Sequence, residues 1–364
     1  MRDHEGLEQL RSSGLNLGER PYDFYTLETA EDLTALNAML IRHRDSGGRH
    51  PRLVMNFVLA NLILANLDFA KMSAESWRHI DLLPLAQGLP AGWNRPGLFD
   101  AYKQGIADGV FYPALHGSTH FCRAAVERNL SGDGKRAELL RSLWHAGTPY
   151  IHWRMPWIGY EYWDPEKPED QRMMPAEMQK KAIGETVGQF AKMFSALPRS
   201  ACAPGYRANG DTHRAWAQHG IRVAQNGPGS NAPPHFDRYE ILQIARNVEF
   251  EPAIDTSFSV ELCLQKAERA FASGLAAIVS VHSINFHSTV RDFRTPTLKA
   301  LDEFLTALES KHADLLYLHD DGLYELVSKG FDQTSENAVH ATVIRKNFSK
   351  RGLAAQKTQG RELP

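Results

Sequence analysis

Paired cysteines, long apolar runs without polar interruptions and an excess of either charge are all missing from this chain of 364 residues. The three cysteines, Cys122, Cys202 and Cys263, lie far apart and form no C-x-x-C pair, which disfavours a cysteine-based zinc or redox site. With 41 Lys+Arg against 43 Asp+Glu, no long-range field attracts nucleic acid or an anionic membrane. The first residues are polar where a secretion signal needs an apolar core. We therefore expect a cytoplasmic protein without a nucleic-acid partner, and the sequence does not indicate its oligomeric state.

Other absences disfavour whole classes of function. The one long apolar stretch, residues 53–70, carries Asn56, Asn61, Asn66 and Asp68, which are costly at the centre of a bilayer, so no membrane span is expected. No G-x-G-x-x-G opens a helix after a strand, and neither G-x-x-x-x-G-K-[ST] nor G-x-S-x-G occurs. Dinucleotide-binding, P-loop and serine-hydrolase functions are therefore poorly supported.

What the sequence does contain is a repeated alternation of helices and strands. Hydrophobic residues make up 43% of the chain, which is ordinary for a globular protein. The first expected helix follows Thr29, a good capping residue, and buries one apolar face. We expect further helices at residues 99–108, 121–129, 175–196, 211–219, 260–273 and 297–311, and strands at 53–58, 110–115, 200–203, 221–224, 275–282 and 315–318. This alternation predicts parallel crossover units, and hence an α/β barrel or a doubly wound sheet.

Polar residues follow several of these strands at their carboxyl ends. Residues 116–120 follow one strand, His282 ends another, and residues 319–321 follow a third. In parallel α/β folds the ligand site gathers at the carboxyl ends of the strands, so these residues predict one shared pocket. Residues 150–172 are rich in Trp and Tyr and lack clean periodicity, and we expect them to form a long loop over that pocket.

Two histidines in this set have the spacing of metal ligands. His116 and His120 lie four residues apart, which on a helix places both imidazoles on one face and within reach of one ion. We expect the pair to open a helix straight after a strand. Histidines that are hydrogen-bonded in place or face solvent would give the same spacing.

Two further side chains are candidates for acid–base and orienting roles. His282, at a strand end, can transfer a proton near neutral pH, and a strand-end histidine held in a turn fits the pattern equally. Arg207 follows the short strand at residues 200–203, where it is either an orienting group or a surface arginine. The aromatic residues of 150–172 suit stacking on sugar rings, and they also suit the base of a loop.

Taken together, these segments resemble a polysaccharide-deacetylase-like family related to carbohydrate esterase family four. The resemblance covers most of the chain and rests on short motifs at residues 52–69, 111–120, 203–207, 250–252 and 280–286. It implies one distorted (β/α)7–8 barrel over residues 1–346, followed by a polar tail at residues 347–364. We expect this barrel to be incomplete at its first strand, because no strand precedes the segment at residues 7–25 that resembles the family's first helix.

The resemblance also implies a function, which is the metal-dependent removal of acetyl groups from an acetylated sugar polymer or oligomer. It implies that His116 and His120 hold a divalent metal, for which zinc is the expected ion, and that His282 is the general acid. Arg207 would orient or charge-stabilise the base.

One departure from the family concerns the carboxylates. In the family, a first strand ending in Asp-Asp supplies the base and the third metal ligand. Here Asp68 is the candidate for both roles, with Asp3 as the other substitute, and a truncated start or a lost site are the remaining alternatives.

Two other functions remain open at this stage. The first is a non-catalytic carbohydrate-binding protein that keeps the barrel and the aromatic loop. The second is a barrel glycosidase using paired acids such as Glu161 and Asp164, which requires two carboxyls ~5 to 9.5 Å apart. Bound metal would favour the deacetylase over both, and acetate release would separate it from the binding protein.

Overall fold

The computed structural model describes residues 4–15, 20–62, 80, 82–89, 95–146, 154–228 and 232–329. Three of the predictions made above lie outside these residues: the roles of Asp3 and Asp68, and the polar tail at 347–364. None of the described helices is long and apolar enough to cross a membrane.

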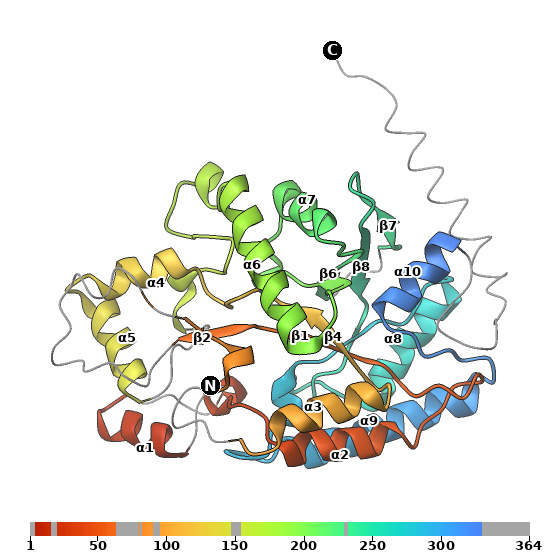
Figure 1. The fold of residues 1–364 in the computed structure, drawn as a ribbon. Coiled ribbons are helices and arrows are strands. Elements are labelled where there is room, and N and C mark those ends of the chain that lie inside the picture. Colours follow the sequence, from red (N-terminus) through yellow and green to blue (C-terminus); the bar gives the residue numbers. More distant parts are fainter. Residues whose placement is uncertain are drawn as a thin grey trace.

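A row of parallel strands forms the centre of the molecule (Figure 1). The main sheet has the order β1 (Leu53–Phe57), β4 (Phe111–Leu115), β5 (Ser200–Ala201), β6 (Val223–Pro228), β8 (Leu242–Arg246) and β7 (His235–Phe236). Neighbouring strands are parallel except β7, which pairs antiparallel with β8. Just after β8, β9 (Val248–Glu249) pairs in parallel with β10 (Val279–Ser280). The carboxyl ends of the parallel strands therefore gather at one edge.

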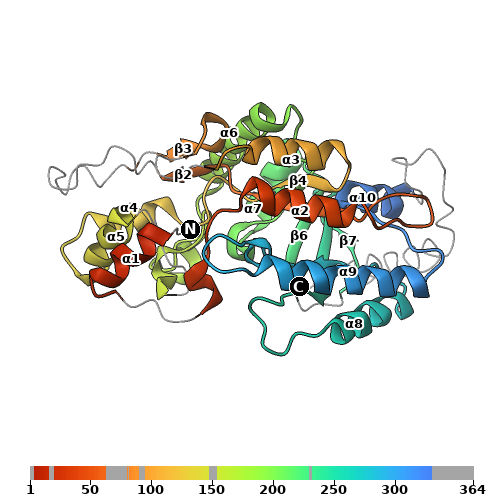
Figure 2. The same ribbon diagram turned by 90° about the horizontal axis from the view of Figure 1, so that it is seen from below.

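Helices surround this row on its outer sides. One side carries α2 (Ala30–Leu40), α3 (Leu98–Ala107) and α9 (Arg294–Lys311), and the opposite side carries α6 (Ala176–Phe194) and α7 (Gly210–Gln218) (Figures 1 and 2). Near the β8 end lie α8 (Val260–Ala272) and α10 (Asp320–Lys329). Apolar faces of these helices and of the strands form the main core, in which Tyr162, Phe190, Phe250 and Phe304 are fully buried.

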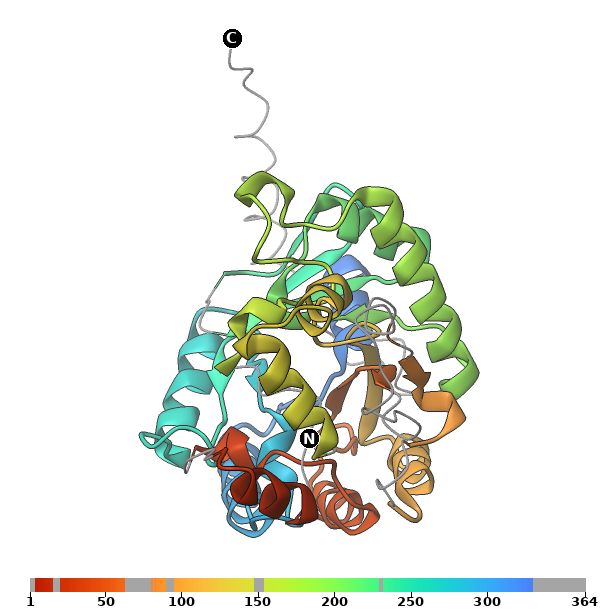
Figure 3. The ribbon, with the colours of Figure 1, turned by 90° about the vertical axis from the view of Figure 1, so that its left-hand side faces the viewer.

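A second, smaller core lies beyond the carboxyl end of β4. There α4 (Arg123–Leu130) and α5 (Lys135–His145) pack with α1 (His4–Ser12) and with η6 (Pro156–Ile158). Figure 3 shows α1, α4 and α5 in front of the strands. A short antiparallel pair, β2 (Ala60–Leu62) and β3 (Leu82–Pro84), continues from β1. These elements frame the edge at which the polar residues gather.

Local sequence signals explain where elements begin. At the start of α2, the Thr29 side chain accepts a hydrogen bond from Asp32 N at 3.1 Å, and Thr29 N donates to Asp32 Oδ2 at 2.9 Å. This capping box satisfies two backbone donors that a helix start leaves unpaired. The predicted apolar face of this helix is buried, and it consists of Leu33, Leu36, Met39 and Leu40.

The predicted α/β architecture with parallel strands is confirmed, and closure into a barrel remains a prediction. Within the described residues, β1 has β4 as its one strand partner. The predicted strand at residues 315–318 is wrong. That segment is irregular because Asp45 Oδ2 accepts from Tyr317 N at 2.8 Å and Ser46 N donates to Leu315 O at 3.1 Å, which replaces strand pairing.

The predicted strand at residues 275–282 is also too long. Only Val279–Ser280 forms a strand, because the Asn247 side chain bonds the preceding backbone, accepting from Ile278 N at 2.8 Å and donating to Ala276 O at 3.0 Å. A side-chain amide thus satisfies polar groups that a ladder would otherwise pair.

Candidate functional site

The loop after β4 carries the two histidines predicted to bind a metal. Residues 116–122 are not helical and α4 begins at Arg123, so the prediction that the two histidines share a helical face is wrong. The β1–β4 pairing extends into this loop, because His116 N donates to Phe57 O at 2.9 Å. Gly117 then takes a φ of +80°, a conformation that glycine adopts without steric cost and that no helix continues.

The loop nevertheless brings the two imidazoles together. Their ring centroids lie 5.2 Å apart, with the planes inclined by 54°. His116 Nδ1 lies 2.8 Å from the backbone oxygen of Cys202, so this nitrogen donates and Nε2 carries the lone pair. Burial, helped by the charges of Arg246 and His282, lowers the pKa of His116 to about 4, against the opposing effect of the hydrogen bond to Cys202 O. His116 is therefore neutral near pH 7, which is the form that binds a metal ion.

The pair has the chemistry of a metal site but is not a complete one. In most metal sites, the ring nitrogen of a histidine that does not bind the metal donates to a carbonyl or carboxylate, which fixes the tautomer. The backbone oxygen of Cys202 is this acceptor for His116 Nδ1. Across the residues that the structure describes, no group of three His, Cys, Asp or Glu side chains is placed to hold a metal ion. Asp68, the predicted third ligand, lies outside those residues. The third ligand therefore remains a prediction.

A buried glutamate lies behind the histidine loop. Glu161 Oε1 accepts a hydrogen bond from Ser118 N at 2.9 Å, and Oε2 is buried without a hydrogen-bond partner among the described residues. A Cβ at Gly117 would collide with this Oε2, so the glycine is also needed for close approach. Burial raises the pKa of Glu161 to about 7, against the opposing effect of the hydrogen bond from Ser118.

We expect Glu161→Gln to change how stability depends on pH. The pKa of Glu161 is near 4.5 in the unfolded chain and about 7 in the folded protein. The favourable contribution of Glu161 to the free energy of unfolding is therefore present below pH 4.5 and is lost as the pH rises through 7. This loss is on the order of 3 kcal/mol in the free energy of unfolding. Glutamine keeps the contact with Ser118 and carries no charge. Urea unfolding should show the variant gaining stability relative to the wild type between pH 4.5 and 8.

The matched control is Glu169→Gln, because Glu169 is exposed on the short helix at Glu169–Gln171. Its free energy of unfolding should follow the wild type at each pH. If Glu161→Gln also follows the wild type, the buried carboxyl does not titrate as described.

A histidine that is hydrogen-bonded to a buried carboxylate lies at the end of β10. His282 Nδ1 lies 2.6 Å from Glu251 Oε1, and Asn285 Nδ2 donates to the other carboxylate oxygen at 2.8 Å. Asn285 is itself fixed, since it is fully buried and accepts from Ala253 N at 2.8 Å. Glu251 is buried, whereas the His282 side chain is 43% exposed. The imidazole is thus oriented on its Nδ1 side and open to solvent on the rest of the ring.

Two partly exposed tyrosines lie close to this edge. The Tyr22 ring stands edge-on to His282, with ring centroids 6.4 Å apart. Tyr206 follows β5 and accepts a hydrogen bond from Arg246 at the end of β8. The two tyrosines are 36% and 40% exposed. Tyr206 also has a φ of +57°, which is rare for a bulky residue and is found mainly where a site requires it.

The Arg207 side chain packs against the aromatic loop. Its guanidinium stacks over the Trp163 ring at 4.6 Å from the centroid, and its side chain is exposed. Trp163 contacts Tyr160, whose ring meets the edge of His120 at 5.7 Å. The irregular loop predicted at residues 150–172 is seen from residue 154 onward, and its aromatic rings border the histidine pair. The orienting role of Arg207 remains a prediction.

Sequence reasoning missed three residues of this edge and misjudged a fourth. Glu251 lay in a motif without an assigned role, while Arg246 and Tyr22 gave no signal at all. Asp164, proposed as half of a glycosidase pair, is held by Arg128 through two hydrogen bonds of 3.0 Å, one to each carboxylate oxygen. This bidentate ion pair favours a structural role for Asp164.

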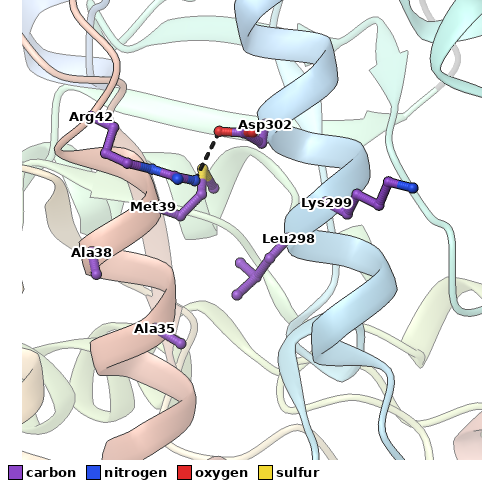
Figure 4. Close-up of a pocket in the computed structure, with 7 residues that line it drawn as sticks. All are labelled: Ala35, Ala38, Met39, Arg42, Leu298, Lys299 and Asp302. Carbon is purple, nitrogen blue, oxygen red and sulfur yellow. Dashed lines mark hydrogen bonds and ion pairs between the residues drawn. The ribbon is translucent and has the colours of Figure 1, made fainter.

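A hollow on the helical side of the molecule is a weaker candidate. It lies between α2 and α9 and is bridged by the Arg42–Asp302 ion pair at 2.9 Å (Figure 4). Its lining consists of Ala35, Ala38, Met39, Arg42, Leu298, Lys299 and Asp302. None of these side chains belongs to the strand-end edge, so we place the site at the edge.

Comparison with known proteins adds a weak similarity of fold. No protein-family model and no curated protein matches the sequence. A family 4 carbohydrate esterase from Streptomyces lividans in complex with acetate is 11% identical, over 77% of this chain and 82% of that chain, with a TM-score of 0.34. A de-N-acetylase from Aggregatibacter actinomycetemcomitans is 12% identical, over 72% of this chain and 87% of that chain, with a TM-score of 0.30.

A third solved structure has a different activity. The α-amylase AmyC from Thermotoga maritima is 10% identical, over 63% of this chain and 51% of that chain, with a TM-score of 0.35. These low similarities do not discriminate among the three named activities.

Proposed function

We propose that the chain is a metal-dependent hydrolase that removes acetyl groups from an acetylated sugar polymer or oligomer. The observation that carries this proposal is the His282–Glu251 pair. A half-exposed imidazole is oriented by a buried carboxylate at 2.6 Å, at the same sheet edge as the neutral His116. Oriented histidines of this kind act as general acids and bases in hydrolysis.

The acid–base step follows from the atoms at the end of β10. Because Glu251 holds the Nδ1 proton of His282, Nε2 is the nitrogen that exchanges a proton with the substrate. Water adds to the acetyl carbonyl group while a base takes its proton. As this adduct collapses to acetate, the bond to the amine or alkoxide breaks and the protonated His282 donates its Nε2 proton to the departing group. The Glu251 carboxylate stabilises the imidazolium before the transfer.

The opposite side of the proposed site consists of the histidine pair. His116 and His120 would hold a divalent ion, for which we propose zinc, with Asp68 as third ligand or base. When bound, such an ion supplies Lewis-acid polarisation of the acetyl carbonyl group. Cys202 contributes only its backbone oxygen, because burial raises the pKa of its thiol to about 11 and the thiol stays protonated.

Exposed aromatic rings support a carbohydrate as the substrate. Tyr22 and Tyr206 flank the edge near His282, and Tyr160 and Trp163 border His120. Flat rings with one polar end suit contact with the apolar faces and the hydroxyls of sugars. A non-catalytic carbohydrate-binding protein would use the same rings, so catalysis has to be tested separately.

The test is acetate release from a panel of N- and O-acetylated oligosaccharides. Protein supplied with zinc should release acetate, and protein treated with a chelator should release far less. Retention of the oligosaccharides on immobilised protein without any acetate release would instead establish the binding protein.

A further inference from the structure

Arg246, at the carboxyl end of β8, is a buried cation without an acidic partner in the described structure. Its side chain is 9% exposed. Its Nε donates to Asn226 O at 3.2 Å and its Nη2 donates to the Tyr206 hydroxyl. No carboxylate of the described residues forms an ion pair with it. A guanidinium has five N–H donors, so three remain for another acceptor.

The buried carboxylate of Asp320 does not neutralise Arg246, because it is hydrogen-bonded to other side chains. Asp320 Oδ2 accepts from Gln225 Nε2 at 2.7 Å and from the Ser200 hydroxyl. Arg246 acts on Asp320 only through longer-range attraction. Burying a guanidinium without a carboxylate in contact with it costs free energy. Such a buried arginine is therefore expected where a bound ligand supplies the negative charge.

Tyr206 adds a second donor at the same point. Its hydroxyl oxygen accepts from Arg246, which leaves its own O–H to donate to a ligand. Burial raises the pKa of Tyr206, which keeps this proton in place at neutral pH. The ring lies 5.0 Å from the Arg246 guanidinium carbon and is partly exposed. The left-handed backbone of Tyr206 holds the side chain in this position.

We propose that Arg246 and Tyr206 form a binding site for an oxyanion, and that the sugar substrate carries a carboxylate beside the acetyl group that is removed. The planar fork of an arginine matches a carboxylate with two parallel hydrogen bonds. The site adjoins the catalytic edge, because Tyr206, which accepts from Arg246, follows Cys202 by four residues. The backbone oxygen of Cys202 contacts His116 Nδ1. The assignment of the anion to the substrate rests on the proposed function, whereas the anion site itself does not.

The experiment compares binding of glucuronate and glucose to the full chain by titration calorimetry, at constant ionic strength and with a chelator present. The chelator removes binding through a metal ion. The wild type should bind glucuronate and bind glucose at least about 10-fold more weakly, the ratio that one charge-assisted hydrogen bond supplies. Arg246→Gln should lose about 10-fold to 100-fold in glucuronate affinity, and Tyr206→Phe should lose a few-fold.

Arg238→Gln is the matched control, because Arg238 is an exposed arginine in the turn between β7 and β8. It should bind glucuronate like the wild type. If Arg246→Gln does not fold, Arg246→Lys keeps the charge without the fork and should bind with intermediate affinity. Equal affinity for both sugars in the wild type, or unchanged glucuronate affinity in the folded Arg246 variants, overturns the site.

The two proposals fail separately. Glucuronate binding that depends on Arg246, without acetate release from any acetylated sugar, leaves the anion site and removes the hydrolase. Acetate release by a protein that treats glucuronate and glucose alike leaves the hydrolase and removes the anion site.

Discussion

Replacing His282 by alanine is expected to lower the rate of acetate release by ~10² to 10⁴ while leaving the metal content unchanged. The variant loses the nitrogen that gives its proton to the leaving group. It keeps Glu251 in place, because Asn285 Nδ2 still donates to that carboxylate at 2.8 Å. Acetate release at saturating substrate measures the first quantity, and elemental analysis after dialysis measures the second.

A matched control separates this loss from a general effect of removing an imidazole. His235→Ala changes an exposed histidine in β7, whose one described hydrogen bond is a long contact to Pro233 O at 3.4 Å, and it should keep full turnover. Glu251→Gln should retain His282 but shift the pH profile of turnover, because an amide stabilises the imidazolium less than a carboxylate does. Unchanged turnover in His282→Ala would remove its role as the acid. Loss of metal in that variant would make His282 a ligand.

The double variant His116→Ala, His120→Ala is expected to lose its metal after mild dialysis, and with it nearly all acetate release. The two rings lie 5.2 Å apart in a loop that is tied to β1, so both ligands are removed without disturbing a helix. The metal content should fall from near stoichiometric to background, and Asp68→Asn should lower it by a smaller amount. Elemental analysis of dialysed protein measures this.

Thermal unfolding provides the accompanying control for the histidine pair. Added zinc should raise the melting temperature of the wild type and of His235→Ala. The reason is that an ion that binds only the folded state stabilises that state by mass action. The double variant should show no such rise. Equal metal content in the wild type and the double variant would contradict the metal site.

The elements that sequence alone predicted best are those with strong local signals. Thr29 marks the start of α2 and Pro175 marks the start of α6, and both helices begin within one residue of the expected position. Short runs of mostly apolar residues likewise predicted β1 and β4. These signals act over a few residues and do not depend on the rest of the fold.

The errors arise where distant side chains replace local preferences. Residues 116–120 were expected to open a helix, but Glu161 bonds Ser118 N from a segment more than 40 positions along the chain, and this holds the loop open. Residues 315–318 were expected to pair as a strand, but Asp45 takes the backbone donor of Tyr317. Neither contact leaves a trace in the local sequence.

The residues of the candidate site divide in the same way, into those with a local sequence signal and those placed by contacts between distant segments. His116, His120 and His282 were predicted as site residues because strand ends in parallel folds gather ligand-binding groups. Arg246 was missed because β8 was not predicted, since Gln243 and Arg246 interrupt its apolar run. The pairing of Glu251 with His282 spans 31 positions, and spacing alone gives no distance across such a gap.

If this strand-end edge breaks acetyl bonds of a sugar, the mass spectrum of an acetylated oligosaccharide after incubation with the zinc-supplied protein will show it. We expect product masses that differ from the substrate by whole acetyl groups, at unchanged chain length, and no such products with His282→Ala. Shortened oligosaccharides that keep their acetyl groups, or a spectrum identical to that of the untreated substrate across the N- and O-acetylated panel, would contradict it.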